Sequence, residues 1–371
     1  MVDRVLVVGG GVGGMTAAIS LARRGVAVTL IDADPQWRVY GAGISVTGIS
    51  LRAFDDLGIL DEVRERGFVG AGVRLRSVSG HVIMESPVPE NPLPIQSGGG
   101  ILRPALHDIL SRAVRAAGVE VRLGIKAEAL HDDGDGVDVA FSDGSSGRFD
   151  VVAAAEGIFS ATRRMLFPEA PAPRFTGQGC WRILAPRPAH LDRTELYVGG
   201  AVKLGINPVS RDQIYVFVLE HVPDNPWFAP EEQLPHLDAL LAPFGGDIPA
   251  IRASLGTASQ VNYRPLEWLL LPSPWYKGRI VLIGDSAHAT TPHMASGAGI
   301  AVEDGLVLGE ELTSGTSVDE ALARFMARRF ERARIVVENS VRIGEIEMAA
   351  GDQVPATTIM GETMHQLQQP Y

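Results

Sequence analysis

The stretch VLVVGGGVGG, residues 5–14, decides the fold of this chain. Its first four residues form an apolar run with the length and composition of a buried parallel strand. The glycines that follow have the spacing G-x-G-x-x-G, at Gly9, Gly11 and Gly14. A helical pattern begins at Met15, and a second apolar run at 27–31 ends on the acidic residue Asp32. This order predicts a strand–helix–strand unit.

The order of strand, glycine turn, helix, strand and acid is the fingerprint of a dinucleotide-binding site. Gly9 permits the sharp turn, Gly11 lets the backbone approach a pyrophosphate, and Gly14 lets the helix pack closely on the strand. The helix N-terminus presents unpaired N–H groups and a positive dipole end to the phosphates. Asp32 can accept hydrogen bonds from ribose hydroxyls. We therefore predict a bound dinucleotide of unspecified kind; the alternative is a glycine turn that packs the unit without a ligand.

Composition narrows the class of protein. Of the 371 residues, 46 % are apolar, which is enough for a large core in two or three domains. The formal net charge of −11 argues against a nucleic-acid-binding surface. Cys180 is the sole cysteine, so no disulfide forms within the chain, which is typical of a reducing, cytoplasmic location. The histidines show no metal-ligand spacing, so we expect no metal. No apolar stretch reaches the roughly 18 residues of a membrane span.

The first half of the chain alternates helices, strands and loops. We predict a helix over 49–66, a hairpin over 73–87 that turns at Gly80, a proline- and glycine-rich loop over 89–100, and a helix over 104–117. Further strands are predicted at 119–123, on both sides of the turn signal Asp143-Gly144, and at 149–155.

The pattern changes near residue 175. Between 175 and 264 aromatic residues concentrate, and we predict antiparallel strands at 179–185, 195–198, 201–207 and 213–220 with one helix at 230–241. The α/β pattern returns with a strand at 279–283, which ends in Gly284-Asp285. A capping box at Ser317 opens a long helix that reaches Met348, and 351–371 shows no clear period.

These patterns predict an α/β fold in which a Rossmann-like nucleotide domain is interrupted by a β-rich insert. The nucleotide domain takes residues 1–72, 101–174 and 265–350 and ends in the long helix. The antiparallel insert, which we expect to bind substrate, takes 73–100 and 175–264, and 351–371 forms a tail or lid. A split nucleotide domain is uncommon among nicotinamide dehydrogenases and ordinary among flavoproteins that wrap an extended FAD.

Three further segments make a family resemblance specific. They are Leu102-Arg103-Pro-Ala-Leu-His107, Glu156-Gly157-Ile-Phe-Ser160-Ala-Thr-Arg163, and Gly278-Arg-Ile-Val-Leu-Ile-Gly284-Asp285-Ser-Ala-His288, which is followed by Pro292, Gly297-Ala-Gly299 and Glu303-Asp304. Together with the N-terminal fingerprint they resemble the single-component (group A) FAD-dependent aromatic hydroxylases, of which para-hydroxybenzoate hydroxylase is the familiar member. The resemblance covers about residues 4–350. Within the family, the urate-, hydroxynicotinate- and salicylate-type hydroxylases look most similar.

The resemblance implies a set of FAD contacts. It places the pyrophosphate on the fingerprint glycines, the adenosine ribose on Asp32 and the ribityl hydroxyls on Asp285. It places Arg103 against FAD, and against the isoalloxazine ring it places Pro292, Gly297, Ala298 and Gly299. The helix N-terminus at these glycines would stabilise the negative charge that collects on reduced flavin.

The resemblance also implies NADH or NADPH as a transient co-substrate. It links Glu156 and Arg163 with contacts to NAD(P)H or FAD, although Glu156 replaces the aspartate of the family pattern and is one methylene longer. No second strand-linked G-x-G-x-x-G occurs in the chain. The nicotinamide cofactor would therefore bind without a Rossmann domain of its own.

Strand alternation supplies candidates for the substrate site. Lys203, Gly205 and Asn207 share one face, and Tyr215 and Phe217 share a face of the next strand. In urate-hydroxylase-like members, a cation and a tyrosine at the positions of Lys203 and Tyr215 manage substrate charge. Lysine in place of arginine loses bidentate recognition, which argues against urate. The predicted catalytic residues are Tyr215, Lys203 and His293, and the predicted substrate contacts are Arg182, Tyr197, Tyr215 and Phe217.

Each candidate has a plainer alternative: a solvated lysine, a core tyrosine or a loop histidine. The resemblance implies a monomeric or dimeric monooxygenase that uses NAD(P)H and dioxygen, through a flavin C4a-hydroperoxide, to hydroxylate a small phenol or N-heteroaromatic. Two alternatives stay open: an epoxidase or natural-product tailoring oxidase, and a non-catalytic protein that binds FAD and a ligand.

Overall fold

The computed structural model describes residues 2–39, 41–70, 72–86, 98–256, 259–349 and 353–371. The predicted loop at 89–100 lies almost entirely outside the described residues, which resume at Gly98.

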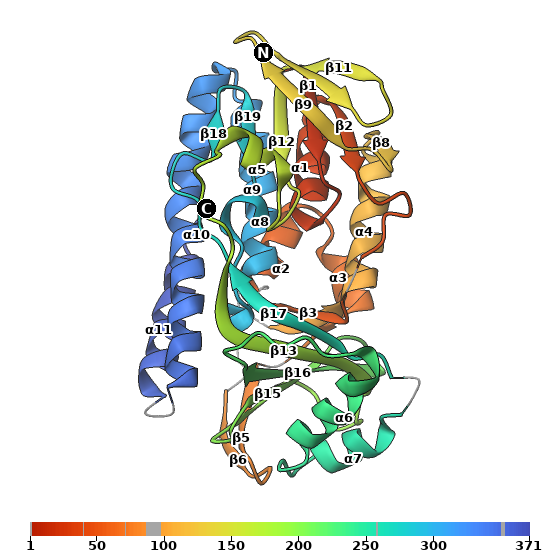
Figure 1. The fold of residues 1–371 in the computed structure, drawn as a ribbon, viewed down its shortest axis with the longest axis vertical. Coiled ribbons are helices and arrows are strands. Elements are labelled where there is room, and N and C mark those ends of the chain that lie inside the picture. The colour runs from red at the N-terminus through yellow and green to blue at the C-terminus, as the bar shows by residue number, and fades with distance from the viewer. Residues whose placement is uncertain (1, 40, 71, 87–97, 257–258, 350–352) are drawn as a thin grey trace.

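A six-stranded sheet forms the core of one half of the molecule, the upper half in Figure 1. In spatial order its strands are β18 (Tyr276–Lys277), β19 (Ile280–Leu282), β12 (Val151–Ala154), β1 (Arg4–Val8), β2 (Ala27–Asp32) and β8 (Glu120–Leu123). All neighbours are parallel except β18 and β19. The chain runs from β1 outward to β2 and then returns to β12 on the other side of β1, so the strand order reverses there. Open α/β sheets bind ligands at the carboxyl ends of the strands that flank such a reversal.

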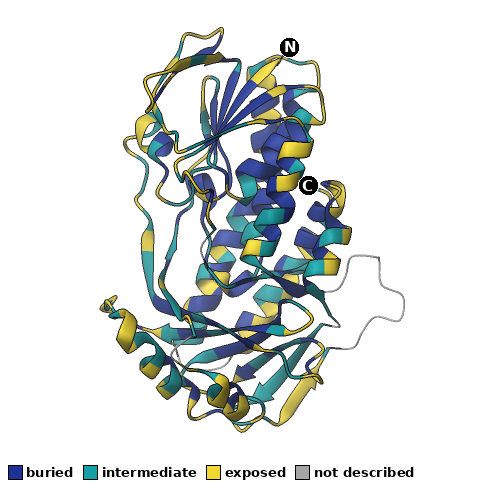
Figure 2. Cartoon of the chain, turned by 90° about the vertical axis from the view of Figure 1, so that its right-hand side faces the viewer, coloured by how far each residue is buried: buried dark blue, intermediate teal, exposed yellow. Residues whose placement is uncertain are grey.

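Two different layers cover this sheet. A helical layer is made of α1 (Val12–Ala22), α4 (Arg103–Ala116), α9 (Gly297–Leu312) and α10 (Val318–Met348). Buried residues concentrate in the sheet and in these helices (Figure 2). The opposite layer is an antiparallel sheet of β9 (Ala127–Asp132), β10 (Val137–Phe141) and β11 (Ser146–Phe149). Its Phe141 and Phe149 pack against Leu6 and Ile31 of the six-stranded sheet.

A seven-stranded sheet forms the other half. In spatial order its strands are β17 (Asn262–Trp268), β13 (Arg174–Pro186), β16 (Gln213–His221), β15 (Lys203–Pro208), β14 (Thr194–Val198), β5 (Val73–Ser77) and β6 (Val82–Glu85). Only β14 and β5 pair in parallel. Helices α6 (Pro230–Leu241) and α7 (Ile248–Ser254) cover one face, and the other face is turned toward the first half (Figure 1). The predicted fold class is therefore confirmed, whereas the domain boundaries stay a prediction.

A short sheet of β3 (Gly43–Val46), β7 (Gly99–Leu102) and β4 (Phe68–Val69) contacts this second face. A Cβ atom on Gly43 would lie 2.8 Å from Cβ of Tyr215, and one on Gly100 would lie 2.9 Å from the Asn207 amide nitrogen. The remaining elements are α2 (Gly48–Asp56), α3 (Leu60–Arg66), α5 (Ala161–Leu166), α8 (Asp285–His288), the 3-10 turn η1 (Pro292–Met294) and α11 (Val354–Leu367).

The structure departs from the predicted helices in three places. The helix expected over 49–66 is broken into α2 and α3, because Gly58 adopts a left-handed φ of +71° and its N–H bonds the carbonyl of Asp55. Helix α1 begins at Val12, inside the glycine turn, and not at Met15. The segment 351–371 contains a regular helix, α11, whose Thr363 and Leu367 are buried, and α11 lies beside α10 (Figure 1).

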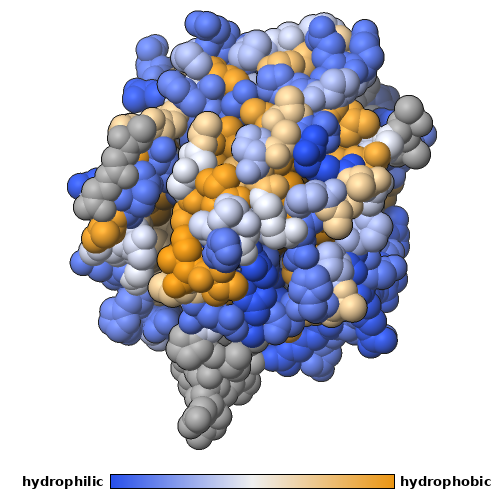
Figure 3. Space-filling view, turned by 90° about the horizontal axis from the view of Figure 1, so that it is seen from below, coloured by the Kyte–Doolittle hydropathy of each residue, from blue (hydrophilic) through white to orange (hydrophobic). Residues whose placement is uncertain are grey.

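The surface is largely hydrophilic with apolar interruptions, as the view from the end with α6 and α7 shows (Figure 3). Val82, Ile83 and Met84 of β6 are exposed, and β6 is an edge strand of its sheet. In the part of the chain that the structure describes, no helix has the length and hydropathy needed to cross a membrane.

Candidate functional site

The loops after β1 and β12 meet at the carboxyl ends of the parallel strands, and only glycine fits at two positions there. Gly9 has a φ of +104°, and a Cβ atom on it would lie 2.4 Å from the carbonyl oxygen of Ala155. A Cβ atom on Gly14 would lie 1.9 Å from the carbonyl oxygen of Gly9. A Cβ atom on Gly11 would meet nothing within 4 Å. The backbone therefore packs closely at Gly9 and Gly14 and is open at Gly11. The fingerprint requires this opening for the approach of a pyrophosphate.

Asp32 ends β2 beside this turn and orders it. Its carboxylate accepts hydrogen bonds from the N–H groups of Gly10, at 2.7 Å, and Asp34, at 2.8 Å. The indole of Trp37 donates to the carbonyl of Gly10 at 2.9 Å. A carboxylate oxygen has more than one lone pair, so Asp32 keeps acceptor capacity for a ribose hydroxyl. That contact stays a prediction.

A second loop and a helix end lie against the glycine turn. A Cβ atom on Gly13 would lie 3.5 Å from Cβ of Ala301 and 4.0 Å from Cα of Gly284. The start of α1, the Gly284-Asp285 turn and the start of α9 therefore converge. Helix α9 begins at Gly297, and geometry leaves the N–H groups of its first turn without intrahelical acceptors. This arrangement brings together the residues predicted to hold FAD between the Gly9 turn and Gly299.

Asp285 and Arg103 are charged side chains without partners in this region. No hydrogen bond or ion pair joins either side chain to another residue among those described, and Asp285 is exposed to solvent. Nevertheless, desolvation by the surrounding protein raises the pKa of Asp285, although His288 and Arg103 oppose the shift. Burial also lowers the pKa of Arg103, and the nearby positive charge of Arg182 lowers it further. Asp285 and Arg103 are both reached by solvent and surrounded by protein. They therefore face a space inside the fold.

The segment after β12 has a structural role that the sequence did not predict. The Glu156 carboxylate accepts from Oγ of Ser160 at 2.6 Å and from N–H of Thr162 at 2.9 Å, so it caps α5. The buried Arg163 guanidinium donates to the carbonyls of Ser286 and Ile158, at 2.9 and 2.6 Å. This side chain therefore ties its loop to the Asp285 turn, and the expected contact of Glu156 and Arg163 with NAD(P)H or FAD stays a prediction.

A buried ionic network supports the Asp285 turn from behind. Asp304 on α9 accepts from the N–H of Gly284 at 2.8 Å and pairs with Nε2 of His288. Arg329 on α10 donates to Asp304 at 2.8 Å and to Glu303 at 2.7 Å, and all three side chains have no exposed surface. Burial raises the pKa of Asp304, but His288 and Arg329 together outweigh burial and lower that pKa to about 2. Sequence reasoning noticed Glu303-Asp304 but missed Arg329.

The seven-stranded sheet presents one polar and aromatic face toward these loops. The register pairs Lys203 with Leu219, Gly205 with Phe217, and Asn207 with Tyr215. The two groups predicted strand by strand therefore lie on the same face of the sheet. Arg182 of β13 pairs with Phe217 and lies on the same face. A Cβ atom on Gly205 would lie 2.1 Å from the Phe217 ring, so glycine makes room for that ring.

Arg182 and Tyr215 form a pair on this face. Nε of Arg182 donates to the hydroxyl of Tyr215 at 3.0 Å. Desolvation raises the pKa of Tyr215 to about 12, so the phenol stays protonated at neutral pH. The hydroxyl therefore accepts from Arg182 and keeps its own proton for another acceptor. The rings of Tyr215 and Phe217 lie 5.7 Å apart and form an aromatic wall.

The prediction that Tyr197 contacts the substrate is wrong. It has no exposed surface and lies on the opposite face of the sheet, in the core with Phe244 beneath α6 and α7. Its register partner is Leu204, one residue out of phase with Lys203 and Gly205. Because a shift of one residue changes the face of a strand, Tyr197 cannot line the face that carries Tyr215.

Lys203 and His293 meet at a residue that the sequence did not single out, Glu347 of α10. The Lys203 ammonium lies 2.5 Å from Oε1 of Glu347, and Nε2 of His293 lies 3.5 Å from Oε2. Burial and the charge of Lys203 lower the pKa of His293 to about 3, so this histidine is neutral near pH 7 and is no general acid there. A signal existed: Ser340, Ile343, Gly344 and Glu347 follow the helical spacing of a buried stripe, which places an acid among buried residues.

The arrangement fits FAD. The open glycine turn, two unpaired charged side chains and the free first turn of α9 lie in one connected region, and an extended dinucleotide has phosphates, ribityl hydroxyls and an electron-poor ring to match them. No group of three or more His, Cys, Asp or Glu side chains that could hold a metal occurs within the described ranges. The fold and the site define a flavin-binding protein with a substrate-facing sheet.

Comparison with known proteins agrees with this class. Residues 3–340 match the model of a family described as FAD binding domain. Aurachin C monooxygenase/isomerase of Stigmatella aurantiaca is 33% identical over 350 residues, 92% of this chain and 89% of that protein. The 2-heptyl-3-hydroxy-4(1H)-quinolone synthase of Pseudomonas aeruginosa (strain UCBPP-PA14) is 30% identical over 352 residues, 92% of this chain and 89% of that protein.

Comparison with solved structures also indicates a flavin-binding protein. The crystal structure of Klebsiella pneumoniae HpxO complexed with FAD and uric acid superposes with a TM-score of 0.85 at 25% identity, covering 99% of this chain and 93% of that one. The chain belongs to the FAD binding domain family, that of the group A flavin hydroxylases. It is an FAD-dependent monooxygenase. The non-catalytic alternative is therefore not supported.

Proposed function

We propose that this enzyme uses NADH or NADPH and dioxygen to hydroxylate a small phenol or N-heteroaromatic. The observation that carries the proposal is the Arg182–Tyr215 pair, set on a sheet face opposite Arg103, Asp285 and the start of α9. When bound, the flavin accepts hydride and activates dioxygen. What the chain must add is orientation of the substrate, exclusion of water and control of substrate protonation.

The Asp285 side of the site would hold the cofactor. The proposed FAD contacts are Gly9, Gly11, Gly14, Asp32, Arg103, Asp285, Pro292, Gly297, Ala298 and Gly299. Pro292 is exposed and Gly297 is partly exposed. The N–H groups of the first turn of α9 have no intrahelical acceptors. The positive end of the α9 dipole would then face the part of the flavin that becomes negative on reduction.

Tyr215 would orient the substrate. Its protonated hydroxyl can donate to a substrate hydroxyl or carbonyl oxygen while Arg182 donates to it. The neighbouring guanidinium groups of Arg182 and Arg103 create a positive potential at the same place, which favours loss of a proton from a substrate hydroxyl. A ring that carries a deprotonated oxygen is electron-rich, and an electron-rich ring is what an electrophilic oxygen attacks.

The relatives favour an N-heteroaromatic. One relative is named for a quinolone product, and HpxO was solved with uric acid. Phe217 and Tyr215 offer a flat apolar wall to such a ring, and they would also keep water from the reacting atoms. Lys203 stands where recognition of a urate anion would favour arginine, so we propose a different heterocycle.

The proposal is tested by aerobic NADH and NADPH oxidation with the FAD-loaded enzyme and a panel of phenols, quinolones and hydroxypyridines. We expect at least one aromatic to accelerate oxidation of the nicotinamide and to yield a product heavier by one oxygen atom. A result in which no aromatic changes the rate would refute the substrate class. Slow oxidation that yields only hydrogen peroxide would also count against it.

A further inference from the structure

Glu347, in the last turn of α10, connects three parts of the molecule. Its Oε1 lies 2.5 Å from the Lys203 ammonium of β15, and its Oε2 lies 3.5 Å from Nε2 of His293, in the turn before α9. The His293 side chain has no exposed surface, and the Glu347 side chain keeps only 16%. Among ion pairs between described residues, Lys203–Glu347 alone joins the seven-stranded sheet to the half that holds the glycine turn. One carboxylate thus links the substrate-facing sheet, the long helix and the turn that contains Pro292.

The carboxylate decides which nitrogen of the His293 ring carries the proton. The ring is neutral near pH 7 because its pKa is lowered to about 3, so one nitrogen donates and the other accepts. No described residue donates to Oε2 of Glu347 or to Oε1 of Gln178, and both atoms are acceptors. A Cβ atom on Gly344 would lie 3.0 Å from Oε1 of Gln178 and 3.1 Å from Nε2 of His293, so this second acceptor is also near Nε2. A bare Nε2 would turn its lone pair toward two acceptors, whereas an Nε2–H group gives them a donor.

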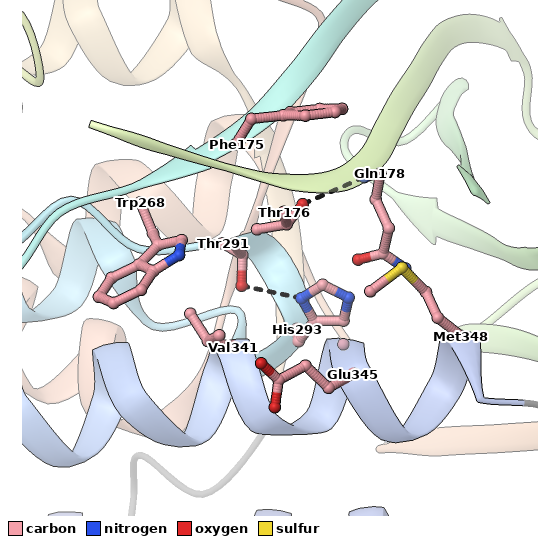
Figure 4. A pocket seen from close by; sticks show the side chains of 10 residues that line it. Phe175, Thr176, Gln178, Trp268, Thr291, His293, Val341, Glu345 and Met348 are labelled. Atoms are coloured by element: carbon pink, nitrogen blue, oxygen red, sulfur yellow. Dashed lines mark hydrogen bonds between the residues drawn. The ribbon is translucent and has the colours of Figure 1, made fainter. Parts of the chain in front are cut away.

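The other ring nitrogen, Nδ1, lies 2.8 Å from the Thr291 hydroxyl (Figure 4). With the proton on Nε2, the Thr291 hydroxyl donates to Nδ1. Nε2–H then points to Oε2 of Glu347, whose Oε1 accepts from Lys203. The link between Nε2 and Oε2 is longer than the roughly 3 Å of an N–H···O bond, so a small movement closes it. The four side chains therefore alternate donors and acceptors from β15 to the turn before α9.

Packing alone does not fix this turn. Thr291 and His293 line a cavity of about 130 Å³, which Gly344 also lines and leaves open because it has no side chain. Hydrogen bonds to the side chains on both sides of Pro292 must therefore hold the turn in place. Pro292 itself is exposed and is a proposed contact of the isoalloxazine ring.

We propose that Glu347 is a positioning residue that orients the His293 ring and thereby fixes Pro292 at the flavin. Lys203 holds the Glu347 carboxylate in the place that this requires. The role rests on the proposed function for the place of Pro292. It gives Lys203 and His293, which the sequence predicted to be catalytic, a positioning role through Glu347. Because its charge is paired with Glu347, Lys203 is no free cation for an anionic substrate.

Two substitutions at position 293 test the direction of the chain. His293→Gln places an amide N–H near the position of Nε2, whereas His293→Asn places an amide near Nδ1 only. In the FAD-loaded proteins we expect His293→Asn to weaken FAD binding roughly tenfold and to change the visible circular dichroism of the flavin, and His293→Gln to stay within about threefold of the wild type. Equal behaviour of the two variants, as loss or as retention, would overturn the proposal.

FAD dissociation on dilution and the visible spectrum provide these measurements, and neither needs a substrate. A wild-type enzyme that hydroxylates no aromatic would therefore refute the proposed function without changing the comparison at position 293.

Exchange of charges separates positioning from a simple tie between the two halves. Lys203→Glu combined with Glu347→Lys restores an ion pair but turns an ammonium toward Nε2–H. We expect the double variant to recover most of the Tm lost by Glu347→Lys alone, while FAD retention and the flavin spectrum stay altered. Glu338→Gln, an exposed change on α10, is the control and should match the wild type. Recovery of both the Tm and the flavin spectrum would show a structural tie only and contradict the proposal. If the double variant does not fold, the comparison at position 293 decides.

Discussion

At the scale of single residues, the Asp285 carboxyl has two opposite effects: it lowers the stability of the cofactor-free protein, and it is proposed to bind FAD. Desolvation raises the pKa of its carboxyl, so the folded protein without cofactor binds a proton there more tightly than the unfolded chain does. The stability contributed by this group is full below the ordinary aspartate pKa and is lost as the pH rises through the raised pKa. At neutral pH the ionised carboxyl therefore costs stability in the absence of FAD.

We predict that Asp285→Asn raises the Tm of the cofactor-free protein at pH 7 and that the gain shrinks as the pH falls through the raised pKa. The same substitution should weaken FAD retention about tenfold or more, because an amide is a poorer acceptor for ribityl hydroxyls than a carboxylate. Thermal unfolding across pH and the ratio of bound flavin to protein measure both effects. Unchanged flavin content would remove Asp285 from the cofactor site.

Tyr215 is predicted to act on the substrate and not on the cofactor. Tyr215→Phe removes the hydroxyl that accepts from Arg182 and keeps the ring that packs beside Phe217. We expect hydroxylation to slow roughly 10- to 100-fold, the value of one oriented hydrogen bond near a charge, with FAD content unchanged. Single-turnover rates with an accepted aromatic provide the measurement. If the variant is as fast as the wild type, the hydroxyl of Tyr215 has no role in the reaction and only its ring contributes, by packing beside Phe217.

Residue-level prediction succeeded where the pattern is local and failed where partners are distant in the chain. That Lys203, Gly205 and Asn207 share one face, and that Tyr215 and Phe217 share one face, follows from strand alternation and is predicted from the sequence. Glu347 lies 144 residues from Lys203, and no spacing rule connects them. The prediction for Tyr197 is wrong because its face relative to Lys203 depends on the pairing of two strands, which the sequence of one strand does not determine.

At the scale of elements, α10 supports the flavin-facing turn through buried charge. Arg329 is fully buried between Asp304 and Glu303, and Asp304 holds the N–H of Gly284. Arg52 and Arg332 extend the network from Glu303 to carbonyls near the end of α11. The C-terminal helix is thus fastened to the network behind the Asp285 turn.

We predict that Arg329→Met lowers the free energy of unfolding by about 3–5 kcal/mol, because it removes the buried cation that Asp304 and Glu303 share. FAD affinity should fall as well, since the Gly284 turn loses its fixed anchor. Arg334→Met, an exposed change on the same helix, should cost at most about 1 kcal/mol. Denaturant unfolding and flavin titration report the two effects. Equal costs for the two variants would show that the buried network contributes little.

Most elements could be predicted from local signals. The capping box at Ser317 marks the start of α10, and the turn at Asp143-Gly144 marks the β10–β11 hairpin. The break between α2 and α3 was missed because both helices share one apolar pattern, and only the left-handed Gly58 separates them. Helix α11 was missed because its burial depends on α10 and the arginine network, which a local period does not encode.

At the scale of the whole molecule, the split chain brings the two working surfaces together. The six-stranded sheet gathers the glycine turn, the Asp285 turn and the start of α9 at one edge, and the seven-stranded sheet turns its polar and aromatic face toward them (Figure 1). The division of the chain could be predicted from the sequence. The glycine fingerprint and Gly284-Asp285 both belong to the nucleotide-binding half, and the β-rich segment lies between them in the chain. Which residues share the substrate-facing side of the seven-stranded sheet could not be predicted, because that depends on how the strands pair.

The central claim is that the enzyme transfers one oxygen atom from dioxygen to an aromatic ring held between these surfaces. The most direct measurement is mass spectrometry of the product formed under oxygen-18 gas by the FAD-loaded enzyme with NADH or NADPH and an accepted aromatic. We predict a product that contains one oxygen-18 atom. A hydroxyl oxygen derived from water, or consumption of all the dioxygen as hydrogen peroxide, would contradict the account.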